Sequence, residues 1–147
     1  MNIFGDIGNS ETKIFLFDYN YKIKKSISFP SKKINRNILQ SKFKFLVKDF
    51  NKIEKILFCS VVPNTFNMIK KFLKLKTKKK CFEIKDLNLK KFINIEVNFK
   101  QAGSDRITNA ISLLDGKNNF IILDFGTATT FDVLIKKTYR GGVIAPG

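Results

Sequence analysis

Histidine is absent from the sequence, and cysteine occurs only twice, as Cys59 and Cys81. The two cysteines lie in separate strand-like apolar runs, without the short paired spacing that zinc-binding motifs use. Familiar zinc motifs are therefore excluded. We expect both cysteines to be buried, reduced thiols.

Long apolar runs are also missing. No stretch approaches the roughly 20 consecutive apolar residues that a membrane helix needs, and residues 1–10 lack the basic and apolar regions of a signal peptide. The 147 residues match the length of one domain, and the 44% hydrophobic content is enough for a core. These features predict a globular cytoplasmic protein that does not enter a membrane.

Acidic residues are scarce: there are 12, against 28 lysines and arginines, which gives a net charge of +16. Such an excess can attract nucleic acid. However, the lysines are spread along the chain among many Ile, Asn and Phe residues, as A- and T-rich codons would produce, and the densest run, Lys74–Lys80, is expected to be a solvated loop. Nucleic-acid binding is therefore the least favoured function, and steep salt-dependent retention on DNA would be its sign.

Apolar periodicity predicts alternating strands and helices. Strands are expected at residues 2–6, 13–18, 21–29, 56–62, 81–84, 120–123 and 130–135. Helices are expected at residues 39–50, after Pro63 with Asn64 as the cap, and from Asp105 to a stop at Asp115-Gly116. The last stretch, Gly141–Gly147, predicts a glycine-rich bend.

Two turns share one pattern. Asp6-Ile7-Gly8 and Asp124-Phe125-Gly126 each follow an apolar strand, continue into polar residues and precede a second strand. The repetition predicts two similar half-domains, at residues 1–115 and 116–147, each opening with a hairpin. The two glycine-bearing turns would then face each other across a cleft.

The first turn suits a phosphate and its cation. A carboxylate such as Asp6 can hold a hard cation, and Gly8 lets backbone amides approach a phosphate. Further donors and a positive charge follow at Asn9, Ser10, Thr12 and Lys13. The alternative is an ordinary hairpin in which these residue types only supply turn geometry.

The second turn adds hydroxyls at Thr127, Thr129 and Thr130 after the Asp124 carboxylate. Hydroxyls suit phosphate oxygens, and the carboxylate suits a cation that offsets their charge. The alternative is that β-branched threonines simply favour strands. Two such turns in one chain favour phosphate binding over chance.

A third group, Gly103-Ser104-Asp105-Arg106, begins a predicted helix. A substrate carboxylate could rest on the helix N-terminus and bind the Arg106 guanidinium, which would leave Asp105 as a general base for a hydroxyl beside a phosphoryl donor. In the alternative, Ser104 or Asp105 caps the helix and Arg106 points into water.

These segments together resemble the type III pantothenate kinases of the actin and sugar-kinase superfamily. The matching stretches occur in the family's order and spacing: DIGNS (Asp6–Ser10), SVVP (Ser60–Pro63), GSDRITNA (Gly103–Ala110), LDFGTATTFD (Leu123–Asp132) and GGVIAPG (Gly141–Gly147). The resemblance implies an α/β chain with the ribonuclease H-like, actin-like ATPase fold. It also implies ATP-dependent phosphorylation of pantothenate to 4'-phosphopantothenate, the first step of coenzyme A biosynthesis.

The resemblance also implies roles for single residues. ATP would contact Thr127 and the first turn, at Asp6, Ile7, Gly8, Asn9, Ser10, Glu11, Thr12 and Lys13. Pantothenate would bind Gly103, Ser104, Asp105 and Arg106, with Asp105 as the proton acceptor. Mg²⁺ would lie near Asp6, and a monovalent cation, K⁺ or NH₄⁺, would bind Asp124.

The chain departs from the family pattern in two places. Many members carry a tyrosine and an Asn-Pro pair before the Gly-x-Asp-Arg segment, whereas residues 95–99 keep only Asn98. Relatives also continue past Gly147 with elements that complete the second half-domain and support a homodimer. We therefore expect a truncated product whose 120–135 hairpin exposes an apolar face, and which is poorly soluble or inactive alone.

Two other functions stay open beside pantothenate phosphorylation. One is a catalytically silent relative that binds nucleotide or regulates transcription, against which the intact Asp105 and Arg106 argue. The other is a different small-molecule kinase of the superfamily, which the GSDR segment together with the two hairpins disfavours.

Overall fold

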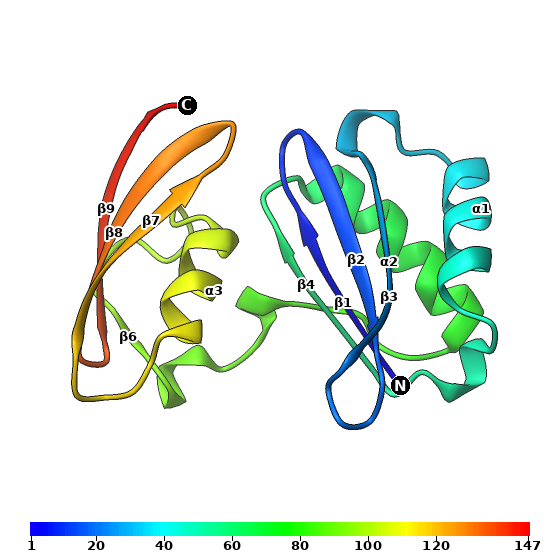
Figure 1. Cartoon of the computed structure of the whole chain (residues 1–147), viewed down its shortest axis with the longest axis horizontal. Coiled ribbons are helices and arrows are strands. Elements are labelled where there is room, and N and C mark those ends of the chain that lie inside the picture. The colour runs from blue at the N-terminus through cyan, green and yellow to red at the C-terminus, as the bar shows by residue number, and fades with distance from the viewer. The chain divides into compact units, whose positions relative to one another are not determined.

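The computed structural model describes residues 1–147, which form two compact units, Met1–Ile84 and Lys85–Gly147 (Figure 1). Each unit combines one β-sheet with helical segments. The half-domains expected on either side of residue 115 stay a prediction. None of the helices is both long and apolar enough to span a membrane.

The first unit is built on a five-stranded sheet with the order β3-β2-β1-β4-β5. Its strands are β1 (Asn2–Ile7), β2 (Glu11–Phe17), β3 (Ile23–Pro30), β4 (Lys55–Ser60) and β5 (Phe82–Glu83). Strands β1 to β3 are antiparallel neighbours, whereas β4 lies parallel to β1 and β5 parallel to β4. All five strands predicted in this part of the chain are confirmed, although their bounds shift by up to two residues.

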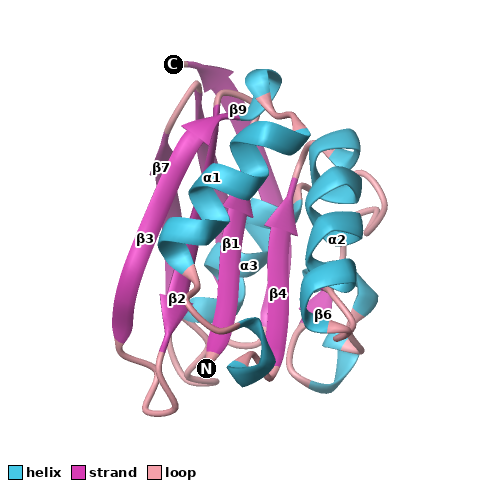
Figure 2. Ribbon diagram, turned by 90° about the vertical axis from the view of Figure 1, so that its right-hand side faces the viewer, coloured by secondary structure: helices cyan, strands magenta, loops and turns pink.

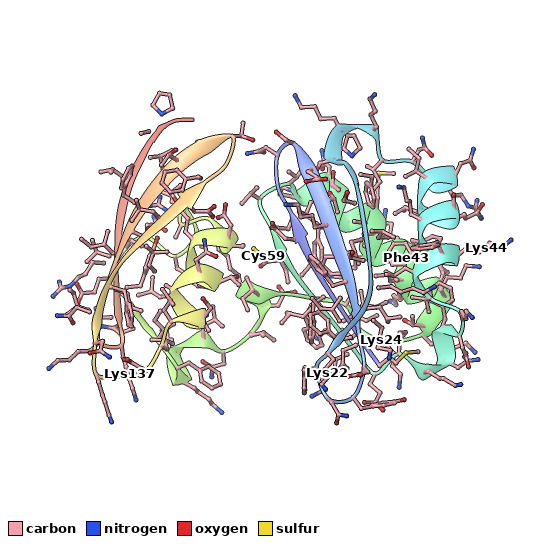
Figure 3. All side chains as sticks on the ribbon, viewed as in Figure 1. Lys22, Lys24, Phe43, Lys44, Cys59 and Lys137 are labelled. Carbon is pink, nitrogen blue, oxygen red and sulfur yellow. The ribbon has the colours of Figure 1, made fainter.

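Two helices, α1 (Arg36–Leu46) and α2 (Pro63–Thr77), cover one face of this sheet (Figure 2). Their apolar stripes build the core: Phe43 of α1 packs on Phe72 of α2 with 5.2 Å between ring centroids, and Phe66 of α2 packs on Phe58 of β4 at 6.0 Å. Figure 3 shows Phe43 pointing from α1 into the unit, whereas the neighbouring Lys44 points outward. Burying each such ring contributes about 1.5–3 kcal/mol.

The expected boundaries of both helices need correction. Helix α1 ends at Leu46, and Phe50 begins a separate 3₁₀-helix, Phe50–Lys52. Helix α2 has Val62 rather than Asn64 as its N-cap, because Pro63 occupies the first helical position, where a missing N–H costs nothing.

The lysine-rich run at residues 74–80 is also partly helical, because α2 continues to Thr77. Leu73 and Thr77 lie four residues apart on the buried side, and the Thr77 hydroxyl donates to the Leu73 carbonyl at 2.8 Å. The prediction of a loop is therefore wrong for the first half of the run, while its lysines are solvent-exposed as expected. Elsewhere Lys22, Lys24 and Lys137, which Figure 3 labels, are also solvent-exposed.

The second unit is built on a four-stranded sheet with the order β6-β9-β8-β7. Its strands are β6 (Asn94–Ile95), β7 (Asn119–Phe125), β8 (Ala128–Ile135) and β9 (Thr138–Pro146). Helix α3 (Ser104–Ser112) lies against this sheet, with Ile107 and Ala110 fully buried (Figure 1). Further 3₁₀-helices occur at Ser31–Lys33, Ile84–Asp86 and Leu89–Lys91.

Two expectations for the second unit are corrected and a third is confirmed. Residues 141–147 were predicted as a bend, but most of them belong to β9, where Gly141 adopts φ 78° at a bulge and a Cβ on Gly142 would overlap the Phe131 carbonyl. Helix α3 ends at Ser112, before the predicted stop at Asp115-Gly116. Finally, the outer face of the sheet is apolar and exposed, which confirms that expectation; it carries Ile121, Leu123, Phe125, Phe131 and Val143.

The cysteines form no disulfide bond. Cys81 is buried, as predicted, but Cys59 is only half-buried. The reason is the alternation of β4, in which Ile56 and Phe58 take the core-facing positions and the next residue takes the opposite face.

Candidate active site

In the first unit, the β1–β2 hairpin carries the predicted phosphate-binding turn. Ile7 and Thr12 pair across the hairpin and are both fully buried. The exposed positions are Asp6, Asn9, Ser10, Glu11 and Lys13, and Gly8 is half-buried. The side chains of Ile7 and Thr12 therefore pack in the interior and have a structural role. The exposed side chains and the turn amides are the groups that a nucleotide could contact.

Ser31, the first residue of the 3₁₀-helix that follows β3, fixes this turn. Its buried hydroxyl donates to the Gly8 carbonyl at 2.6 Å and lies 2.8 Å from the Thr12 hydroxyl, and its backbone N–H donates to the Ser10 carbonyl at 3.0 Å. Ser31 was not among the predicted site residues. The sequence places Ser31 just after β3, and its contact with the turn can be inferred only once β3 is known to pair with β2.

The turn shares a sheet edge with the SVVP segment. Because β1 and β4 are parallel, their carboxyl ends meet: Ile7 pairs with Ser60, and the Val61 N–H donates to the Ile7 carbonyl at 3.0 Å. The Ser60 hydroxyl then accepts from the Val62 N–H at 3.2 Å. In open α/β sheets, ligands bind beyond the carboxyl ends of the strands, which is where these two motifs lie.

In the second unit, the start of α3 presents the Asp105 carboxylate. Gly103 is the N-cap residue and makes no side-chain cap, so the alternative in which Ser104 or Asp105 caps the helix is wrong. Instead, Asp105 Oδ1 accepts from the Arg106 N–H at 2.8 Å. A Cβ on Gly103 would overlap that same oxygen, so glycine leaves the space in which the carboxylate lies.

Arg106 does not point freely into water, because it pairs with a buried carboxylate on β8. Its Nη2 lies 2.7 Å from Asp132 Oδ1, and its Nε donates to both carboxylate oxygens at 3.0 and 2.9 Å. The Tyr139 hydroxyl of β9 donates to Asp132 Oδ1 at 2.5 Å. The hydrogen bond to Asp132 raises the pKa of Arg106, and burial followed by the Asp132 contact raises the pKa of Tyr139.

Asp124 lies on β7 and contacts the same helix. Asn109 Nδ2 donates to its Oδ2 at 2.9 Å, and Thr130 faces it across the β7–β8 ladder. The Thr130 hydroxyl is buried without a hydrogen-bond partner. Directly opposed side chains share one face of a sheet at about 5 Å, so the carboxylate and an unsatisfied hydroxyl oxygen lie near each other.

This donor set fits a monovalent cation better than a caged divalent ion. Nowhere in the chain do three or more Asp, Glu, Cys or His side chains gather as a metal cluster. A single carboxylate with neutral oxygens provides low charge and hard ligands. Asn109 was quoted only as part of the GSDRITNA motif; its amide nitrogen donates to Asp124 and so holds the carboxylate in place.

The predicted residues thus fall into two sets. The exposed turn residues between Asp6 and Lys13 belong to the first unit, whereas Gly103–Arg106 and Asp124 gather around α3 in the second unit. Thr127 is exposed in the β7–β8 turn of the second unit, where the Gly126 N–H donates to the Ala128 carbonyl at 3.2 Å. Asp132, Tyr139, Asn109 and Ser31 are additional groups that the sequence alone did not single out.

The family profile described as "Type III pantothenate kinase" matches residues 2–147. The chain belongs to the type III pantothenate kinase family. A type III pantothenate kinase of Pelagibacter ubique is 58% identical over 147 residues, and one of Thermosipho melanesiensis is 32% identical over 155 aligned positions. All of this chain is aligned in both comparisons, but it spans only 59% of the length of each of these type III pantothenate kinases.

Solved structures with the actin-like, sugar-kinase fold are also similar, which confirms the predicted fold class of this pantothenate kinase family member. A protein from Porphyromonas gingivalis described as an N-acetylglucosamine kinase aligns with a TM-score of 0.56 at 15% identity, covering 97% of this chain and 47% of that protein. A protein from Sinorhizobium meliloti described as a 2-dehydro-3-deoxygalactonokinase aligns with a TM-score of 0.55 at 9% identity, covering 98% and 54%. At these identities the likeness concerns the fold alone.

Proposed function

We propose that this protein phosphorylates pantothenate at its terminal hydroxyl with ATP as the donor, the step that opens coenzyme A biosynthesis. The observation that carries the proposal is the membership of residues 2–147 in the pantothenate kinase family, with Asp105 and Arg106 present in its substrate segment. Its named relatives in Pelagibacter and Thermosipho are type III pantothenate kinases.

The substrate segment supplies an acceptor and an anchor. Asp105 accepts the proton of the pantothenate hydroxyl as that oxygen attacks the γ-phosphorus of ATP, the bond to the β,γ-bridging oxygen breaks and ADP leaves. Arg106 binds the substrate carboxylate. Gly103 and Ser104 contribute backbone at the start of α3, where the helix dipole favours an anion. The proposed roles of Arg106 and Asp105 support each other, because binding of the substrate carboxylate by Arg106 would hold the hydroxyl within reach of Asp105.

The β1–β2 turn and Thr127 hold the nucleotide. In this proposal the amides of Gly8, Asn9 and Ser10 approach the phosphates, and Lys13 adds positive charge beside them. Mg²⁺ near Asp6 would neutralise charge on the phosphate oxygens when bound. Asp124 and Thr130 would hold K⁺ or NH₄⁺, which adds positive charge near the nucleotide.

An assay of the protein as its gene encodes it separates this function from its alternatives. We expect phosphate transfer from ATP to pantothenate in the presence of Mg²⁺ and K⁺, with 4'-phosphopantothenate identified by mass spectrometry. Transfer to a sugar but not to pantothenate would indicate another kinase of the superfamily. ATP binding without transfer to any acceptor would indicate a silent relative.

A further inference from the structure

The ion pair between Arg106 and Asp132 raises a question about the proposed substrate site. Arg106 is the proposed anchor for the pantothenate carboxylate, yet two of its three nitrogens already contact a carboxylate of the chain itself. The side chain of Asp132 is 1% exposed and that of Arg106 is 13% exposed. The pair is therefore part of the interior, not a surface contact that solvent can replace.

The geometry leaves one edge of the guanidinium unused. Nε and Nη2 donate to the Asp132 carboxylate in a bidentate contact, whereas Nη1 donates no hydrogen bond within the chain. Arginine offers five N–H donors in a rigid plane, so fixing one edge also fixes the direction of the remaining donors. A lone arginine would instead lose rotamer freedom each time it bound a substrate.

Tyr139 is the second residue that holds Asp132 in place. Its ring is 1% exposed, and its hydroxyl donates to the same Asp132 oxygen that contacts Nη2. The buried carboxylate thus receives donors from both β9 and α3, and its own position is fixed by two elements. Because Asp132 is fixed in this way, its contact with Arg106 also restricts the orientation of the guanidinium.

We propose that Asp132, held by Tyr139, is a positioning residue that orients Arg106 so that Nη1 binds the carboxylate of the substrate. This inference rests on the proposed function, because it takes pantothenate as the ligand of Arg106. Asp132 itself does not touch the substrate. Its effect on binding therefore passes through Arg106 and depends on the negative charge of the ligand.

The test compares two ligands and four variants of the protein as its gene encodes it. The ligands are pantothenate and pantothenyl alcohol, which has a hydroxymethyl group in place of the carboxylate. The variants are Asp132→Asn, Tyr139→Phe, Arg106→Gln and the double variant Asp132→Asn/Arg106→Gln. Isothermal titration gives the dissociation constants, and circular dichroism checks that each variant is folded.

We expect Asp132→Asn to weaken pantothenate binding by about tenfold or more, as the loss of a partner that orients a ligand group does elsewhere. Binding of the alcohol should change by less than about threefold, because it has no carboxylate to form a bidentate or ionic contact with the Arg106 guanidinium. Tyr139→Phe should weaken pantothenate binding less than Asp132→Asn does. In the Arg106→Gln background, Asp132→Asn should cause no further loss, because residues that act through one another are not additive.

Three results would overturn the inference. They are unchanged pantothenate affinity in Asp132→Asn, an equal loss for both ligands, and additive losses in the double variant. If Asp132→Asn does not fold, Tyr139→Phe makes the same comparison, because it keeps the ring and the ion pair. If the unmutated protein binds no pantothenate, the proposed function fails and the inference with it; if it binds and the variants bind equally well, the inference alone fails.

Discussion

Gly103 is the residue whose smallness matters most directly to the proposed base. A Cβ at this position would overlap Asp105 Oδ1, so Gly103→Ala must push the carboxylate aside. A misplacement of about 1 Å can reduce a rate by up to roughly 100-fold. We therefore expect a kcat at least about tenfold lower for pantothenate phosphorylation, with an unchanged KM for ATP.

Ser112→Ala is the matched control for this variant. Ser112 ends the same helix, is exposed and bonds only to the Asn109 carbonyl at 2.7 Å. Steady-state kinetics should give a lower kcat for Gly103→Ala and an unchanged kcat for Ser112→Ala. A normal kcat in Gly103→Ala would show that the position of the Asp105 carboxylate does not limit the reaction.

Tyr139 gives the fold a dependence on alkaline pH. Burial, and then the hydrogen bond to Asp132, raises its pKa in the folded chain, so the folded state keeps this proton after the unfolded chain has lost it. The stabilisation is therefore complete below the ordinary tyrosine pKa of about 10 and is lost as the pH rises above it, by up to about 1.4 kcal/mol per pH unit.

The measurement is the free energy of unfolding in urea between neutral and alkaline pH. Lysines also titrate in this range, so the informative quantity is the difference between the unmutated protein and Tyr139→Phe, which should shrink as the pH rises. Tyr19→Phe, at an exposed tyrosine, is the control and should leave the slope unchanged. A constant difference across the range would contradict the assignment.

At the scale of elements, the β1–β2 hairpin depends on a residue outside it. Ser31→Ala removes the hydroxyl that bonds to Gly8 and Thr12, and it leaves the buried Thr12 hydroxyl without this partner. Such a loss costs about 1–3 kcal/mol. We expect a decrease of that size in the free energy of unfolding by urea, together with a higher KM for ATP because the turn is less fixed.

Ser28→Ala on the neighbouring strand β3 provides the comparison. Ser28 is exposed, so its removal should change stability by less than about 0.5 kcal/mol. Equal free energies of unfolding for the two variants would show that the Ser31 hydroxyl does not stabilise the hairpin.

The elements also show what the sequence could predict. Alternation and helical periodicity were enough to predict β1 to β4 and the apolar stripes of α1 and α2, because burial on one face imposes those patterns. They failed for β9, whose two glycines lowered its strand signal. There Gly142 is required by the close approach of the Phe131 carbonyl, a contact that exists only after β8 and β9 pair.

The candidate site divides in the same way. Asp105, Asp124 and the hairpin turn were predicted as site residues from local patterns of charge and glycine, and their roles stay predictions. The role of Asp132 was not predicted, although the residue ends the quoted LDFGTATTFD motif, because its contact with Arg106 spans 26 residues from α3 to β8. Tyr139 lies outside every quoted motif and joins the pair only through its hydrogen bond to Asp132. Side chains that act through a tertiary contact become visible only when the sheet register is known.

At the scale of the whole molecule, the outer face of the second sheet predicts self-association. Ile121 is 72% exposed and Phe125 is 77% exposed, and both lie on the same face of β7. Contiguous exposed apolar surface favours association. We expect the 147-residue chain to form oligomers or aggregates at micromolar concentration, measured by sedimentation velocity.

Charge on that face should reverse the effect. Ile121→Lys and Phe125→Lys should each shift the distribution towards the monomer, whereas Phe92→Lys, at a 63% exposed position in another segment, should not. A monomeric unmutated chain at these concentrations would contradict the prediction.

The most direct test of the central claim is the effect of Asp105→Asn on phosphate transfer to pantothenate. The variant keeps the size of the side chain but removes the carboxylate that would accept the proton. We predict that kcat falls by roughly 100- to 10,000-fold, as expected for the loss of a general base, while the dissociation constant for pantothenate stays within about threefold. An unchanged kcat in a folded Asp105→Asn protein would contradict the account.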